Sequence, residues 1–202
     1  MINNYYLKLI NMNYSELCFF LKNKYGLARG NYFVNEKCST KNNNITRTSE
    51  GLVIHHIDED IYSDLQNSEV AKMYSFEFQK IERLRYCNFL AHLLLHFKIV
   101  LEHKYTDIEL IEHNMGKFEL GLGGIEYIVP TINDFFGGSI NFKQWEFNCL
   151  NKISEYFDDY IYILKWFFQE YKKNGLSYIF EELLFYGLDG EIVNNIKNAY
   201  LK

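Results

Sequence analysis

The sequence predicts an α+β fold, and three observations support that prediction. Residues 15–25 and 86–103 show the apolar spacing of amphipathic helices. Between them, residues 30–56 contain two runs rich in β-branched and aromatic side chains, separated by a polar, asparagine-rich turn. From residue 141 onward the apolar spacing is again helical. We therefore expect a β-hairpin with one helix before it and several helices after it.

The N-terminal half divides into elements whose ends the sequence marks. Ser15 is a suitable cap for the first helix, and Gly26 is suited to end it. The second strand of the hairpin is expected to carry His55 and His56 at its end. Residues 57–80 form an acidic connector that is too long for a tight turn, so we expect it to be partly helical.

The C-terminal half begins with a stretch that favours a loop. Residues 121–138 contain five of the twelve glycines and the only proline, without the spacing of a phosphate-binding loop or a dinucleotide fingerprint. Helices are expected after it, with Gly175 and Gly187 as stops. The expected organisation is a core with its N-terminal helix over residues 1–104, a Gly-rich connecting segment over 105–140 and a helical C-terminal region over 141–202.

Composition is typical of a protein of the cytoplasm. The 202 residues are 48% hydrophobic and 23% charged, enough to bury a sizeable core. No window of about 18 apolar residues is present and the N-terminus lacks a signal-peptide pattern, so we expect no membrane segment. The four cysteines are scattered without a C-x-x-C, which argues against a zinc knuckle or a disulfide framework and favours free thiols.

The charge is unevenly distributed along the chain. The net charge is −5, but residues 22–48 carry six basic side chains against Glu36 alone, a local +5. These basic residues are Lys22, Lys24, Arg29, Lys37, Lys41 and Arg47. Such a stretch is more often a solvated surface, but beside a candidate metal site the contact with phosphate becomes the better interpretation.

Four of the six histidines fall in two pairs that suit a metal site. His92 and His96 have an i, i+4 spacing, which puts both imidazoles on one helix face about 6 Å apart along the axis. His55 and His56 are consecutive on a predicted strand, so they point to opposite faces, which suits one ligand and one base. A histidine pair on an apolar helix is by itself more often structural than metal-binding.

Together, the His-His dipeptide and the later helical H-x-x-x-H resemble the HNH endonucleases with a ββα-metal core, in particular small proteins of phages and mobile elements. The resemblance extends from about Gly30 to Ile99. In most of that family an Asn that ties the two strands together stands nine positions before the first helical histidine. This chain has Arg83 at that position, and its nearest asparagine, Asn88, is expected at the start of the helix.

The resemblance implies a metal-dependent endonuclease that cleaves double-stranded DNA. One divalent cation would be held by His55, His92 and His96, while His56 acts as general base. Arg83 is included in the catalytic set for its own position: Arg83 and Arg85 lie just before the helix and could clamp phosphate, although a surface or structural arginine fits equally well. Three imidazoles suit Zn²⁺, Ni²⁺ or Mn²⁺ better than Mg²⁺. The residues expected to contact nucleic acid are Arg29, Lys37, Lys41, Arg47 and Arg85.

Other functions compete with the nuclease. A metalloprotease would need Glu after the first helical histidine, where this chain has Leu93. A DNA-binding or regulatory protein could keep the fold as a metal-stapled scaffold, and the Arg83 departure favours it. The C-terminal helices could also form a homodimer seam or the dock of an immunity partner. The acidic run Asp58 to Asp60 could supply further ligands, although such runs are most often solvated loops, and we leave it out of the catalytic set.

Overall fold

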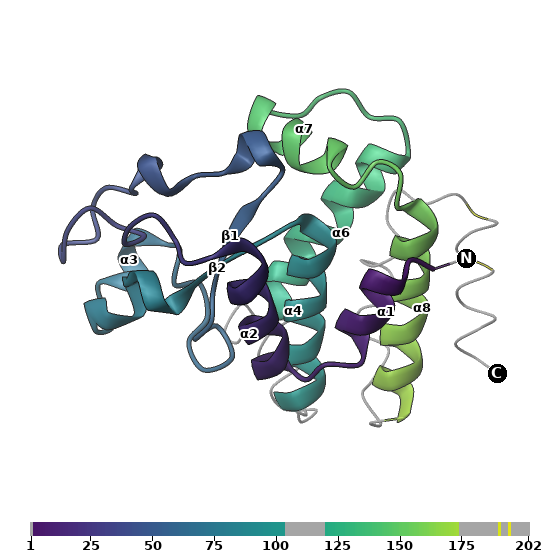
Figure 1. Ribbon diagram of the computed structural model, residues 1–202, viewed down its shortest axis with the longest axis horizontal. Coiled ribbons are helices and arrows are strands. Elements are labelled where there is room, and N and C mark those ends of the chain that lie inside the picture. The colour runs from purple at the N-terminus through teal and green to yellow at the C-terminus, as the bar shows by residue number, and fades with distance from the viewer. Residues whose placement is uncertain (1, 104–119, 174–189, 191–193, 195–202) are drawn as a thin grey trace.

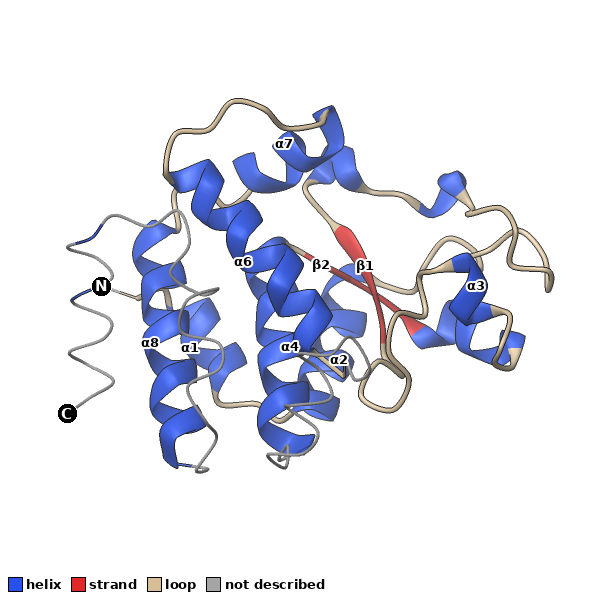
Figure 2. Ribbon diagram, turned by 180° about the vertical axis from the view of Figure 1, so that it is seen from behind, coloured by secondary structure: helices blue, strands red, loops and turns tan. Residues whose placement is uncertain are grey.

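The computed structural model describes residues 2–103, 120–173, 190 and 194. Its helices pack around a central helix, α4, and a two-stranded sheet lies beside them (Figures 1 and 2). This bears out the α+β prediction at the level of fold class. The longer elements are α1 (Asn4–Ile10), α2 (Tyr14–Tyr25), β1 (Val53–His56), β2 (Leu84–Cys87), α4 (Phe89–His103), α6 (Leu122–Phe136), α7 (Gln144–Asn151) and α8 (Phe157–Lys173).

Asparagine side chains begin the N-terminal helices. Asn13, rather than Ser15, caps α2, and it forms a capping box with Glu16. Gly26 ends this helix with a φ of 79°, a value at which a side chain would be strained. At α4, the Asn88 side chain accepts the N–H of Ala91 at 2.9 Å, which confirms its expected place at the helix start.

The predicted hairpin within residues 30–56 is wrong. β1 pairs antiparallel with β2, which lies directly before α4, so that His55 stands opposite Arg85. Residues 30–52 make only isolated bridges and two short 3₁₀ turns, Asn43–Ile45 and Thr48–Glu50. The asparagines explain this difference, because side chains such as Asn42 accept nearby backbone N–H groups and compete with strand pairing.

The segment between the two strands is partly helical, as the sequence predicts. It contains α3 (Ser68–Ala71) and two 3₁₀ turns, Phe76–Gln79 and Ile81–Arg83. A small cluster of buried side chains holds residues 28–52 against the sheet: Ala28, Ile45, Leu52, Leu84 and Tyr86.

The expectation of a loop over residues 121–138 is also wrong, because most of this stretch is α6. The helix buries its apolar face, and burial stabilises each such side chain by about 1.5–3 kcal/mol. That sum exceeds the cost of about 3 kcal/mol for a proline such as Pro130 and of about 1 kcal/mol for each interior glycine. The buried apolar side chains are Leu122, Ile125, Ile128, Val129 and Ile132.

One main core joins the helices on both sides of the expected boundaries at residues 104 and 140. It combines side chains of α1, α2, α4, α6, α7 and α8. The first part of the predicted connecting segment falls in residues 104–119, and the expected stops at Gly175 and Gly187 also lie outside the described residues. In the part of the chain that is described, no helix has the length and apolarity to cross a membrane.

Candidate metal centre

His55 points from β1 toward α4 and is almost completely buried. Its Nε2 lies 2.7 Å from the hydroxyl oxygen of Tyr14, and that hydroxyl also donates to the Ile57 carbonyl at 3.0 Å. A carbonyl can only accept, so both bonds form together when Tyr14 gives its single proton to Ile57 and accepts the Nε2–H of His55. The Nδ1 of His55 is then unprotonated and available as a ligand.

His92 and His96 lie one turn apart on α4, as their spacing predicts. Their Nε2 atoms are 3.1 Å apart, and both rings lie 5.2 Å from the ring of His55, centroid to centroid. Burial lowers the pKa of His92 well below its usual value, and the nearby His96 and His55 lower it further. Burial also lowers the pKa of His96, to about 4, against the opposing effect of Glu59. Both imidazoles are therefore neutral at pH 7, the form that binds metal.

Glu59 joins the three histidines, and we did not include it in the predicted site. Its Oε2 lies 3.2 Å from His55 Nδ1 and 3.7 Å from His96 Nε2. Burial alone would raise the pKa of this carboxyl, but His55, His56 and His96 hold it well below its usual value. The only sequence signal was the acidic run after the histidine dipeptide, a pattern that solvated loops share.

The four side chains, His55, Glu59, His92 and His96, form a group that could hold one metal ion. Each offers a ligand atom, and these atoms all lie within 4.8 Å of one another. Donors on a tetrahedral zinc ion, each about 2.0–2.1 Å from the metal, stand roughly 3.3 Å apart, close to three of the six separations in the group, which are 3.1, 3.2 and 3.7 Å. The Nδ1 of His55, which faces this group, is also buried without a hydrogen bond, a costly arrangement that needs an explanation. The structure thus brings together the three predicted ligands and adds a fourth.

His56 lies outside this group, on the other side of β1. Its ring packs 4.5 Å from the Tyr32 ring, and its Nε2 lies 3.0 Å from Gln79 Oε1. Gln79 donates its amide to the Leu65 carbonyl at 3.1 Å, so its oxygen accepts the Nε2–H of His56. The Nδ1 of His56 faces Glu59 Oε1 at 3.7 Å. His55 is thus a member of the metal group, whereas His56 lies next to the Glu59 carboxylate on the side away from the other histidines.

Arg83 ties the two strands together outside the metal group. Its Nε donates to Asp58 Oδ2 at 2.7 Å, and its terminal nitrogen contacts the other oxygen of the same buried carboxylate. Its backbone carbonyl accepts the N–H of Ile57 at 2.9 Å. The predicted catalytic role of Arg83 stays a prediction, since this guanidinium lies on Asp58 and does not line the cleft described next.

A cleft of about 1070 Å³ opens onto the metal group. Glu59, His92 and His96 form part of its lining, whereas His55 and His56 do not. Residues 41–48 and 63–68 contribute polar side chains to the lining, and α6 and α7 contribute Tyr127 and Trp145. The group is therefore buried yet accessible from one side.

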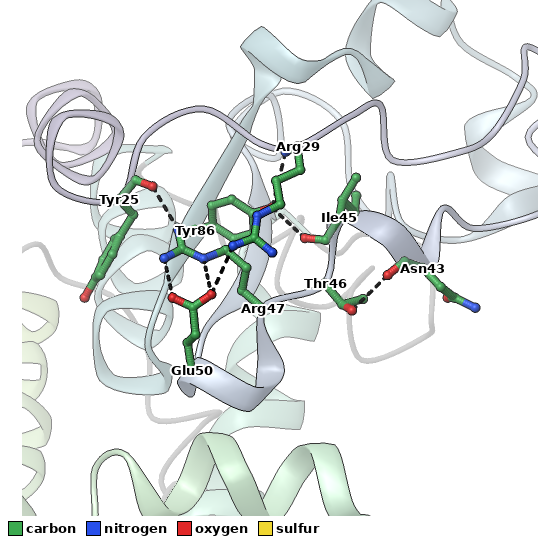
Figure 3. A network of polar contacts seen from close by, with 8 residues as sticks. All are labelled: Tyr25, Arg29, Asn43, Ile45, Thr46, Arg47, Glu50 and Tyr86. Atoms are coloured by element: carbon green, nitrogen blue, oxygen red, sulfur yellow. Dashed lines mark hydrogen bonds and ion pairs between the residues drawn. The ribbon is translucent and has the colours of Figure 1, made fainter.

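The residues predicted to contact nucleic acid lie in different environments, and Figure 3 shows two of them, Arg29 and Arg47. Lys41 and Arg47 line the cleft, and Arg47 is held by Glu50 and by the Tyr25 carbonyl. Arg29 is exposed and pairs with the same Glu50 carboxylate at 3.3 Å. Lys37 is exposed away from the cleft lining.

Arg85 of β2, by contrast, is buried, and its side chain contacts α2. It donates to the backbone carbonyls of Cys18, Glu82 and Leu84 at 2.7–3.1 Å. These bonds occupy the guanidinium inside the protein, so it does not present a surface to phosphate.

The four cysteines are also buried, and they are free thiols as expected.

No protein-family model, curated protein or solved structure matches this chain.

Proposed function

We propose that the protein is a metal-dependent phosphodiesterase that cleaves DNA. The observation that carries this proposal is the group of three histidines and Glu59 at the wall of a cleft that Lys41 and Arg47 also line. Neutral imidazoles suit a divalent ion, and the two cations on the same cleft suit a phosphate backbone. The chain order β1, β2, α4, with histidines on the first and last of these elements, is consistent with the ββα-metal core that the sequence resembles.

The roles of the side chains follow from their places around the cleft. A divalent ion bound here would stabilise negative charge on the scissile phosphate and its leaving oxygen. His55, His92 and His96 would hold it, with Oε2 of Glu59 on the same side. Lys41 and Arg47 would orient the phosphate backbone along the cleft.

The proton of the attacking water needs an acceptor, and Glu59 connects the cleft to one. Its Oε2 faces the metal group while its Oε1 lies 3.7 Å from His56 Nδ1. His56 can therefore take up a proton through this carboxylate, although it does not itself line the cleft. This arrangement keeps His56 as the general base and gives Glu59 the relay between base and water.

A second candidate, a DNA-binding scaffold stapled by metal, is favoured by one feature. Four protein donors complete the coordination of a tetrahedral zinc ion, as in structural sites, whereas catalytic sites keep a position open. An ion that takes five or six ligands, such as Mn²⁺ or Ni²⁺, would leave room for water in the same group. The metal preference therefore separates the two candidates.

Cleavage of DNA tests the proposal directly. Protein stripped of metal by a chelator is incubated with plasmid and with a labelled duplex, with Mg²⁺, Mn²⁺, Ni²⁺ or Zn²⁺ added in turn. We expect at least one ion to restore cleavage in the wild type but not in His92→Ala, with His103→Ala as the control on the same helix. Binding of the duplex without cleavage under every ion would favour the scaffold, and neither binding nor cleavage would reject both candidates.

Salt dependence tests whether DNA occupies the cleft. Lys41→Glu removes a cation from the lining, so the slope of log affinity against log salt should become shallower by about 1, as expected for one lost phosphate contact. Lys37→Glu makes the same charge change on an exposed residue away from the lining and is the matched control. Equal slopes for the two variants would move the DNA surface elsewhere.

A further inference from the structure

Two glycines at the start of α6 lie directly against the His96 turn of α4. Gly121 begins the helix with a φ of 73°, and a Cβ at this position would lie 3.0 Å from the His96 carbonyl oxygen. Gly124 lies one turn further along, inside the helix. A Cβ at Gly124 would stand 2.2 Å from Cε1, 2.3 Å from Nε2 and 2.4 Å from Nδ1 of the His96 ring.

These separations are far below any real Cβ contact, so the ring occupies the space that a side chain at position 124 would take. The backbone of α6 at this point is helical, and helical φ and ψ give no reason for glycine. Glycine is also among the poorest residues for a helix interior. The need for space against His96 is therefore what glycine provides at this position.

The His96 ring has little freedom to move away. The His92 ring lies 4.7 Å from it and the His55 ring 5.2 Å, centroid to centroid, and the Glu59 carboxylate lies 3.7 Å from its Nε2. A side chain at position 124 would press on the face of the ring, over Cε1 and both nitrogens. The ring could yield only by shifting its Nε2 relative to His92 and Glu59.

We infer that Gly124 is a positioning residue for the metal centre: it lets α6 lie directly against His96 and so fixes the ring where its nitrogen meets the other three donors. This inference rests on the metal centre of the proposed function and is independent of the cleavage of DNA. It gives the Gly-rich stretch at the start of α6 a role in shaping the site.

Zinc binding by Gly124→Ala is the first test. Titration calorimetry with Zn²⁺ alone should show at least a tenfold weaker affinity than the wild type, while circular dichroism shows an unchanged helix content. Asp134→Ala adds an alanine at an exposed position of the same helix and should bind Zn²⁺ like the wild type. Wild-type affinity in Gly124→Ala would overturn the inference.

A double-mutant comparison separates contact with the ring from general damage to α6. In metal-free protein, Gly124→Ala should lower Tm when His96 is present. In the His96→Ala background the blocking ring is gone, and the same substitution should leave Tm unchanged or raise it, since alanine is the better helix former. An equal fall in both backgrounds would overturn the inference, because the cost would then arise elsewhere.

The two proposals fail in distinguishable ways. If the wild type does not bind Zn²⁺, the metal centre is rejected and the positioning role falls with it, even where the Tm comparison shows that ring and glycine are in contact. If the wild type binds Zn²⁺ and Gly124→Ala binds it equally well, the metal centre stands and only the role of Gly124 is rejected.

Discussion

The two sides of α4 are chemically opposite. On one side, His92 and His96 meet β1 and α6, and the Nε2 atoms of the two rings lie 3.1 Å apart. On the other, Phe97 stacks on Phe167 of α8 with ring centroids 3.8 Å apart and planes at 9°. The contrast separates two tasks within one helix: the apolar side stabilises the fold, and the polar side is costly to bury until a ligand completes it.

The largest expected effect lies on the apolar side. Phe97→Ala should lower the free energy of unfolding by about 3–5 kcal/mol, because it removes a fully buried ring and leaves a cavity. Urea denaturation measures this loss. The variant should keep wild-type affinity for Zn²⁺ under conditions where it is still folded. A parallel loss of zinc affinity would mean that the two sides of α4 are not independent.

Breaking the polar side should affect ligand affinity more than stability. His92→Ala should weaken Zn²⁺ binding at least a hundredfold, equivalent to about 2.7 kcal/mol, whereas His56→Ala should keep most of the affinity because His56 lies outside the group of donors. Both variants should lose cleavage of DNA. Calorimetric titration of the two proteins side by side checks this division, and equal losses of affinity would contradict it.

Removal of the Tyr14 hydroxyl, which contacts His55, should have a smaller effect on zinc affinity. Tyr14→Phe removes the acceptor that fixes the protonated Nε2 of His55. Loss of such a partner to a metal-bound histidine costs about 10–100-fold in affinity, so Zn²⁺ binding should weaken within that range. Tyr86→Phe removes a hydroxyl that bonds the Ile45 carbonyl, away from the donors, and is the control. An unchanged affinity in Tyr14→Phe would argue that His55 does not bind the ion through Nδ1.

The smallest effect at pH 7 concerns Lys98, a buried cation on the apolar side of α4. Lys98 donates to the Ile10 carbonyl at 2.9 Å and lies over the Trp166 ring. Burial lowers the pKa of Lys98 to about 8, against the opposing effects of Glu102 and Glu16. Between pH 8 and about 10.4, the usual value for lysine, the folded protein therefore releases a proton that the unfolded chain keeps, and stability rises with pH.

Lys98→Met should remove this dependence. At pH 7 the variant should be more stable by about 1 kcal/mol, the low end for replacing buried charge by apolar side chains. This gain should shrink and then reverse as pH rises from 8 to 10.4, because each pKa unit stabilises the wild type by about 1.4 kcal/mol. Thermal unfolding at several pH values measures it. A gain that does not change with pH would show that the charge on Lys98 is not what limits stability.

Local patterns accounted for the parts of the site that lie within single elements. The ligand helix predicted for residues 86–103 is observed as Phe89–His103, and the i, i+4 spacing of His92 and His96 brings their Nε2 atoms within 3.1 Å. His55 and His56 point to opposite faces because successive side chains alternate along a strand. Each of these features depends only on neighbours along the chain.

Long-range packing decided what the sequence pattern could not. The Gly- and Pro-containing stretch of α6 has weak helical propensity, and it is helical because its apolar face is buried against α4. β1 pairs with a strand 28 or more positions away rather than with the run just before it. Glu59 faces the histidines because the chain turns back after β1, where the N–H of Glu59 bonds the His56 carbonyl at 3.2 Å.

The sequence by itself therefore indicated the two histidine pairs, since spacing on a helix or strand sets direction without any partner, and the family resemblance selected His55 as the ligand of the first pair. Only the tertiary structure decided the fourth donor, the burial of Arg85 and the close approach of Gly124 to His96. These three features arise between segments separated along the chain. Their energies come from contacts that form only when the helices and the sheet pack together, which no local pattern of residue types encodes.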